Sequence, residues 1–113
     1  MTYLLLHNPR CSKSRAALRM LEERGVDLEV RDYQKAPLSL DELRILHKRL
    51  GLPVAEWIRW EEDEARGLDR ASSDRELLQA MAAAPKIMQR PILVHGDDAR
   101  VGRPGPENLE ALL

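Results

Sequence analysis

The chain has 113 residues, with 18 Lys or Arg against 19 Asp or Glu, so its formal net charge is −1. This balance gives no electrostatic support for binding nucleic acid or another polyanion. The length fits one domain, and a 43% hydrophobic content with so little net charge excludes disorder throughout. The longest apolar run, Leu4–Leu6, is far too short for a membrane span and follows no secretory signal pattern, so we expect a cytoplasmic protein away from the membrane.

The first third of the chain predicts a strand, a helix and a second strand. Residues 3–7 form a short apolar run that ends at Asn8-Pro9, a dipeptide that favours a turn. Apolar residues recur with helical spacing across 16–21, and Gly25 follows where a helix would end. The run 26–33 then predicts a strand that returns parallel to the first. The pattern is that of a βαβ unit.

The middle of the chain predicts helices. Ser39 and Ser73 each stand three residues before a glutamate and ahead of an apolar run, which is the spacing of a capping box. Residues 53–66 are expected to be helical but irregular. Together these segments predict a helical insertion over approximately residues 39–85.

The last quarter of the chain predicts a hairpin and a short helix. Residues 91–95 form a strand-like run, 96–98 a turn, and 100–102 the returning strand. Residues 106–113 are expected to form a C-terminal helix. The chain therefore predicts one α/β domain over 1–113, a four-stranded mixed sheet with the helical insertion between its second and third strands.

The single cysteine, Cys11, decides what function can be argued from the residues alone. It cannot close an internal disulfide, so it is an inert core residue, a reactive thiol or an intermolecular partner. Its place between a strand and a helix start favours the thiolate, because free backbone N–H groups and the helix dipole stabilise an anion there. Arg10, Lys13 and Arg15 add positive charge. A buried, unreactive cysteine is the plainer alternative.

The spacing of residues around Cys11 and along the chain disfavours three kinds of site. Ser14 occupies the position of the second thiol in a Cys-x-x-Cys motif, so an oxidised Cys11 would need an external reductant. Ala17 stands where a Cys-x5-Arg phosphatase loop requires arginine, which disfavours that chemistry. No His, Cys or carboxylate group recurs at metal-ligand spacing, so we expect no metal site.

Arginines elsewhere in the chain are candidates for holding an oxyanion. Arg59, Arg90 and Arg103 lie beside predicted core elements, and a guanidinium group can grip a tetrahedral anion with paired hydrogen bonds. Taken singly, each could equally be a surface residue. Arg90 precedes a proline at a strand start, where a cis bond would turn the chain sharply. His7 could tune the thiol loop or play a purely structural part.

Three separated segments, 7–15, 90–92 and 100–104, resemble the signature motifs of the glutaredoxin-coupled arsenate reductase family, in the short bacterial branch that carries Asn-Pro-Arg-Cys-Ser-Lys-Ser-Arg. The resemblance implies a thioredoxin-like fold with Cys11 as nucleophile. It also implies the following roles: His7, Ser14 and Arg15 as thiol-tuning residues, and Arg59, Arg90 and Arg103 as oxyanion ligands.

The resemblance further implies an activity. The Cys11 thiolate would attack arsenate, glutathione would attack the adduct as co-substrate, glutaredoxin would resolve the mixed disulfide and arsenite would leave, in the service of arsenic detoxification. No bound cofactor is implied, and we expect a monomer. Two alternatives stay open: a glutathione-linked thiol oxidoreductase with another substrate, and a binding protein like the Spx-type transcription regulators, which typically carry Cys-x-x-Cys.

Overall fold

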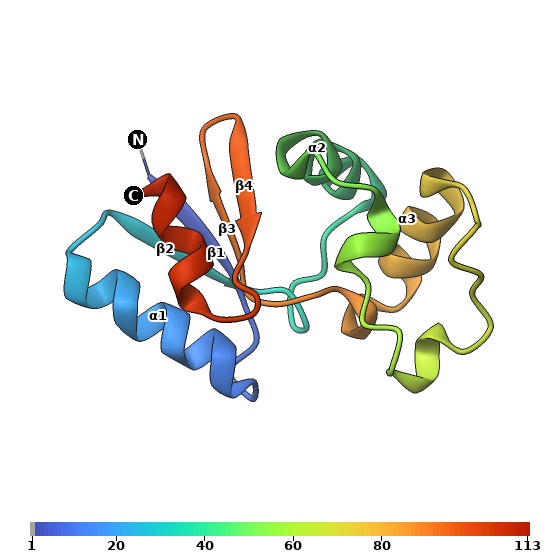
Figure 1. The fold of residues 1–113 in the computed structure, drawn as a ribbon, viewed down its shortest axis with the longest axis horizontal. Helices are drawn as coiled ribbons and strands as arrows, with labels where there is room; N and C mark the ends of the chain where they lie inside the picture. Colours follow the sequence, from blue (N-terminus) through green and yellow to red (C-terminus); the bar gives the residue numbers. More distant parts are fainter. Residues whose placement is uncertain (1) are drawn as a thin grey trace. The chain divides into compact units, whose positions relative to one another are not determined.

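The structure is a computed structural model that describes residues 2–113. The chain separates into two compact units. Figure 1 shows the chain coloured by residue number. The first unit combines residues up to Ala36 with Arg90–Leu113, and the second is Pro37–Gln89. The expectation of a single domain over the whole chain stays a prediction.

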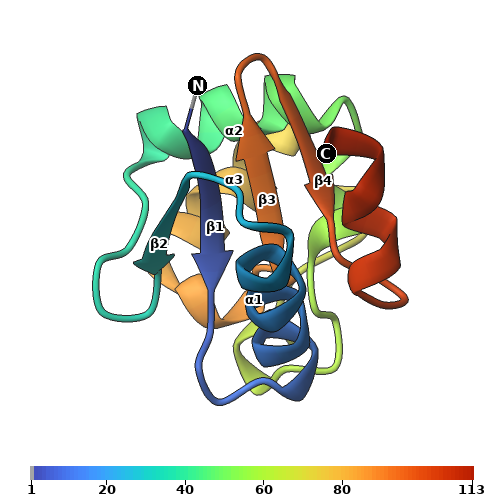
Figure 2. The ribbon, with the colours of Figure 1, turned by 90° about the vertical axis from the view of Figure 1, so that its left-hand side faces the viewer.

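The first unit is built on a four-stranded mixed sheet, as the sequence predicted. Its strands are β1 (Tyr3–His7), β2 (Leu28–Asp32), β3 (Ile92–His95) and β4 (Asp98–Val101), in the order β2-β1-β3-β4. β2 runs parallel to β1, whereas β3 is antiparallel to both β1 and β4 (Figure 2). The C-terminal end of β1, the start of β3 and the end of β4 therefore lie at one end of the sheet.

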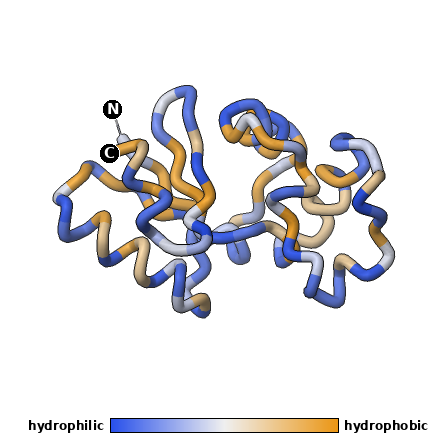
Figure 3. The backbone as a smooth tube through the Cα atoms, viewed as in Figure 1, coloured by the Kyte–Doolittle hydropathy of each residue, from blue (hydrophilic) through white to orange (hydrophobic). Residues whose placement is uncertain are grey.

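Helix α1 (Ser12–Arg24) and the 3-10 helix η4 (Pro106–Leu112) lie on the same face of this sheet (Figure 2). The core beneath them is aliphatic, and hydrophobic positions are concentrated in the central strands β1 and β3 (Figure 3). Its fully buried members are Leu5, Ala17, Leu21, Leu93 and Leu109. Gly25 ends α1 in a left-handed conformation with φ of 67°, which a residue without Cβ adopts freely. This packing fixes the position of the first turn of α1 relative to the sheet.

The second unit is helical. Its α-helices are α2 (Leu40–Leu50) and α3 (Asp74–Ala83), and its 3-10 helices are η1 (Val54–Trp57), η2 (Asp63–Ala65) and η3 (Pro85–Ile87). The expected capping box is complete at Ser39, whose hydroxyl accepts the N–H of Glu42 while the Glu42 carboxylate accepts the N–H of Ser39. The helical insertion between the second and third strands is thus confirmed. Within residues 2–113, no helix has the length and apolar character needed to cross a membrane.

Several predicted boundaries or types were wrong in detail, among them the returning strand, which is Asp98–Val101 rather than 100–102. The second strand is shorter than 26–33, because it pairs with β1 only over Leu28–Asp32. The hairpin turn is also shorter than 96–98: Gly96 adopts φ of 61°, and Asp98 already pairs with His95. The last helix is a 3-10 rather than an α-helix, with Asn108 donating its N–H to the carbonyl of Gly105.

Candidate active site around Cys11

Asn8 shapes the loop that carries the cysteine. Its backbone carbonyl accepts the N–H of Cys11 at 3.0 Å, and its side-chain oxygen accepts the N–H of Arg10 at 3.0 Å. Asn8 is buried, so these bonds close the turn from inside. Cys11 then occupies the N-cap position of α1 with extended backbone angles. The thiol therefore stands at the end of the helix where backbone N–H groups are unpaired.

The pKa of the Cys11 thiol lies below its ordinary value. Burial raises this pKa, but the backbone N–H groups of Ser14 and Lys13, a hydrogen bond from Arg90 and the charge of Arg103 together outweigh burial. All of these favourable groups act on the thiolate rather than on the thiol. Cys11 as a residue is partly exposed to solvent. The site combines a partly exposed cysteine with surroundings that favour its ionised form.

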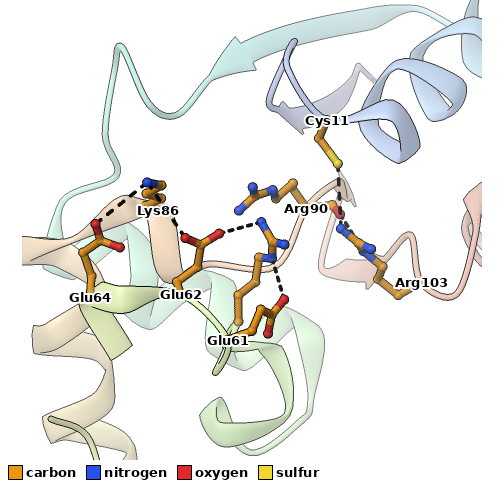
Figure 4. Close-up of polar contacts among 8 residues, drawn as sticks. Cys11, Glu61, Glu62, Glu64, Lys86, Arg90 and Arg103 are labelled. Carbon is orange, nitrogen blue, oxygen red and sulfur yellow. Dashed lines mark hydrogen bonds and ion pairs between the residues drawn. The ribbon is translucent and has the colours of Figure 1, made fainter. Parts of the chain in front are cut away.

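Arg90 and Arg103 reach the cysteine from the sheet. Arg90 precedes β3 and Arg103 follows β4, at the end of the sheet where β1 leads into the Cys11 loop. One terminal nitrogen of Arg103 lies 3.8 Å from the sulfur, and its Nε donates to the carbonyl of Arg90 at 2.9 Å (Figure 4). The peptide bonds that follow both arginines are cis. Two guanidinium groups thus contribute to the surroundings of the thiol.

His7 and Ser14 form a buried pair behind the thiol loop. The Ser14 hydroxyl lies 2.7 Å from Nδ1 of His7 and accepts the backbone N–H of Asn8 at 3.0 Å. Burial lowers the pKa of His7, Asp32 raises it and Arg15 lowers it, with a net shift below the ordinary value. His7 therefore favours its neutral form near neutral pH, and its contact with the loop passes through Ser14.

Arg15 and Arg59 have other contacts in the structure. Arg15 donates to the carbonyl of Pro9 at 3.0 Å, which ties the first turn of α1 to the loop before it. Arg59 belongs to the second unit, where its Nε lies 3.1 Å from Glu61 and a terminal nitrogen lies 2.9 Å from Glu62. The predicted role of Arg59 as an oxyanion ligand stays a prediction.

Some residues that shape this site make contacts that were not predicted from the sequence. Asn8 was interpreted only as part of a turn dipeptide. In turns, however, the side-chain oxygen of an Asn often accepts the backbone N–H of the residue two positions later, as Asn8 does from Arg10. Lys13 was expected to add charge, whereas its ammonium group bonds to the carbonyl of Pro104. Gly102 was part of a motif without a stated role, and a Cβ there would lie 2.7 Å from Cγ of Pro91. Among residues 2–113, no three His, Cys, Asp or Glu side chains gather as a metal site would require.

The sequence and the fold are similar to known proteins over nearly their whole length. An arsenate reductase of Neisseria meningitidis is 45% identical over 113 residues, covering 96% of each chain. The uncharacterized protein YfgD of Escherichia coli is 46% identical over 110 residues, covering 94% of this chain and 92% of that protein. The solved structure of an arsenate reductase from Vibrio cholerae is 40% identical, covers 97% of each chain and superposes with a TM-score of 0.89.

These similarities agree with the sheet and helices described above, and the fold is thioredoxin-like, as the resemblance implied. Residues 6–111, from the end of β1 to η4, match the ArsC family. The match includes Cys11 and both arginines beside it. The chain therefore belongs to the ArsC family.

Proposed function

We propose that this protein is an arsenate reductase whose nucleophile is Cys11. The observation that carries the proposal is the partly exposed thiol at the start of α1, with its pKa lowered and Arg103 at 3.8 Å. A thiolate beside two guanidinium groups suits attack on a small, multiply charged oxyanion, since the same groups bind the substrate and offset its charge. Relatives that bear the name arsenate reductase give independent support.

The first step forms a sulfur–arsenic bond. The thiolate attacks As(V), an As–O bond breaks, and the departing oxygen takes up protons to leave as water. Arsenic stays As(V) in this adduct. Arg90 and Arg103 would bind the remaining arsenate oxygens, which lowers the electrostatic cost of bringing two anions together.

The second step needs a thiol from outside the chain, because Ser14 stands where a resolving cysteine would be. A glutathione thiolate attacks the Cys11 sulfur, a disulfide forms, and the S–As electron pair stays on arsenic, which leaves as arsenite. Two thiols lose two electrons and As(V) gains them. Glutaredoxin then reduces the mixed disulfide by thiol–disulfide exchange. In this scheme glutathione is a co-substrate, the protein holds no cofactor, and a monomer in the glutathione-rich cytoplasm suffices.

The contacts of each residue support the proposed thiol-tuning roles. Ser14 supplies a backbone N–H to the thiolate and joins His7 to the loop, while Arg15 fastens the first turn of α1 to Pro9. Arg103→Ala should lower kcat/KM for arsenate by about tenfold or more, as expected for loss of a charge-assisted hydrogen bond. Arg59→Ala tests the third proposed ligand; equal kinetics with wild type would remove Arg59 from the site.

The deciding experiment follows NADPH oxidation by the purified protein with arsenate, glutathione, glutaredoxin and glutathione reductase. We expect arsenate-dependent turnover that Cys11→Ser abolishes and that stops when glutaredoxin is omitted. Turnover that persists in Cys11→Ser would refute the nucleophile.

The same assay separates the alternatives. Reduction of a glutathione mixed disulfide such as that formed with 2-hydroxyethyl disulfide, without arsenate turnover, would favour a thiol oxidoreductase with another substrate. If the wild-type protein shows neither arsenate turnover nor disulfide reduction but binds RNA polymerase, this result would favour a regulator of the Spx type.

A further inference from the structure

Lys13 links the start of α1 to the segment that carries Arg103. It is the second residue of α1, and its ammonium group donates to the backbone carbonyl of Pro104. Pro104 directly follows Arg103 in the chain. The contact therefore joins two segments that are 91 residues apart in sequence and that both contribute to the surroundings of the Cys11 sulfur.

The segment that Lys13 contacts has Arg103 between Gly102 and Pro104. Pro104 has no backbone N–H, so its own backbone can accept a hydrogen bond but cannot donate one. Two residues earlier, Gly102 donates its N–H to the carbonyl of Pro91 at 2.8 Å. Gly102 fixes the approach to Arg103 from the sheet side, and the Lys13 contact fixes the chain just beyond it.

The Arg103 side chain depends on this backbone placement. Its guanidinium group bonds to the carbonyl of Arg90 through Nε at 2.9 Å, while a terminal nitrogen lies 3.8 Å from the sulfur. The guanidinium group is planar and rigid. Because its Nε is bonded to the Arg90 carbonyl, the side chain has little freedom to keep its terminal nitrogen near the sulfur when the Arg103 backbone moves. A shift at Arg103 would thus change the distance to the sulfur directly.

We propose that Lys13 is a positioning residue that holds Arg103 beside the Cys11 sulfur, and thereby sets how strongly the site attracts an anionic reactant. The proposal rests on the proposed function only for the identity of that reactant as arsenate. Lys13 acts through the contact with Pro104 and through Arg103, rather than by presenting its own charge to the substrate.

The alternative is that Lys13 acts as one more cation near the thiol. The contacts favour positioning, because the ammonium group is engaged by Pro104. Lys13 lowers the pKa of Cys11 through its backbone N–H, whereas Arg103 does so through its charge. Substituting the Lys13 side chain leaves the backbone N–H in place, so the two contributions can be separated.

The test compares the alkylation of Cys11 by anionic iodoacetate and by neutral iodoacetamide at one pH. The ratio of the two rate constants reports how strongly the site attracts an anion and cancels most of the effect of thiolate population. We expect Lys13→Met to lower this ratio about two- to fivefold, in the range of an exposed charged contact. Methionine is an unbranched side chain only one heavy atom shorter than lysine, and it offers no donor to Pro104.

A double-mutant cycle with Arg103→Ala distinguishes the two mechanisms. If Lys13 acts through Arg103, Lys13→Met should change the ratio in the wild-type background and not in Arg103→Ala. Arg10→Met is the matched control: it removes one positive charge from the same loop, and its effect should be the same in both backgrounds. An equal effect of Lys13→Met in both backgrounds would overturn the proposal, and so would an unchanged ratio in the single variant.

Arsenate kinetics complete the experiment. If the protein turns over arsenate, Lys13→Met should lower kcat/KM by a factor similar to the change in the alkylation ratio. The alkylation cycle needs no arsenate, so absence of turnover in wild type would count against the proposed function while the cycle still decides the role of Lys13. Thermal unfolding of each variant checks that the fold is intact.

Discussion

The hydroxyl of Ser14 lies 2.7 Å from Nδ1 of His7, and both residues are buried. The same hydroxyl accepts the backbone N–H of Asn8, so a single oxygen connects the end of β1, the thiol loop and the first turn of α1. A serine at this position is therefore more than the absence of a second cysteine. It holds the loop on which Cys11 stands.

Ser14→Ala should destabilise the protein by about 1–3 kcal/mol, because it leaves the buried N–H of Asn8 and a ring nitrogen of His7 without the Ser14 oxygen. Urea unfolding followed by circular dichroism measures the change. Ser12→Ala is the matched control: Ser12 is an exposed serine of the same turn, and its loss should cost less than about 0.5 kcal/mol. Equal unfolding midpoints for the two variants would contradict the structural role of Ser14.

The lowered pKa of Cys11 predicts that alkylation by iodoacetamide has a lower pH midpoint in the folded protein than in the unfolded chain. Arg103→Ala should raise the midpoint, because a charge that favours the thiolate is lost. The folded thiol ionises at lower pH than the unfolded one, so the thiolate contributes stability that is fully present above the unfolded pKa. This contribution disappears as the pH falls through the folded pKa. A stability difference from Cys11→Ser that does not vary with pH would contradict it.

His7 should titrate below 6.5 in the folded protein, because its burial disfavours the imidazolium form. Proton NMR of the imidazole ring measures the midpoint. Protonation of His7 then favours the unfolded chain. The resulting loss in the free energy of unfolding is absent well above pH 6.5, and it grows as the pH falls from 6.5 through the folded pKa. Asp32→Asn should lower the midpoint further, since the Asp32 carboxylate stabilises the imidazolium. A midpoint above 6.5 in wild type would contradict this prediction, because it would show that the effect of Asp32 outweighs that of burial.

Gly102→Ala should destabilise the protein by about 1–3 kcal/mol through steric overlap. The added Cβ would lie 2.7 Å from Cγ and 3.2 Å from Cδ of Pro91, and a proline ring cannot rotate away as a long side chain can. Because Arg103 is the next residue, the variant should also alkylate more slowly with iodoacetate. Gly67→Ala is the control, since a Cβ there meets nothing within 4 Å. Equal thermal stability of the two variants would contradict the close approach.

Local signals were sufficient to predict most elements of the fold. The apolar run before Asn8-Pro9 predicted β1 with its observed bounds, and the Ser39 capping box predicted the start of α2. Such signals lie within a few residues of one another. The length of the hairpin turn was not predicted correctly because it depends on which strand residues pair, and Asp98 could be assigned to the turn or to β4 on composition alone.

The site was predictable in its chemistry and less so in its contacts. Cys11 could be placed at a helix start because the strand and the helix on either side were both visible in the sequence. The contacts of Lys13 with Pro104 and of Arg103 with Arg90 span large sequence separations, and nothing in the local pattern links their partners. Side chains of Ser14 and His7 are seven residues apart, but their bond requires the turn that Asn8 closes.

The division of the sheet between two distant stretches of chain has a consequence for synthesis on the ribosome. β1 pairs with β3, so the centre of the sheet needs residues made some 90 positions apart, whereas Pro37–Gln89 is one uninterrupted stretch. We therefore expect the helical stretch to acquire structure during translation. The edge of β1 that pairs with β3 stays unpaired until Ile92–Val101 has left the exit tunnel. A stalled or truncated product that ends before β3 would expose that edge and be a target for chaperones or proteases.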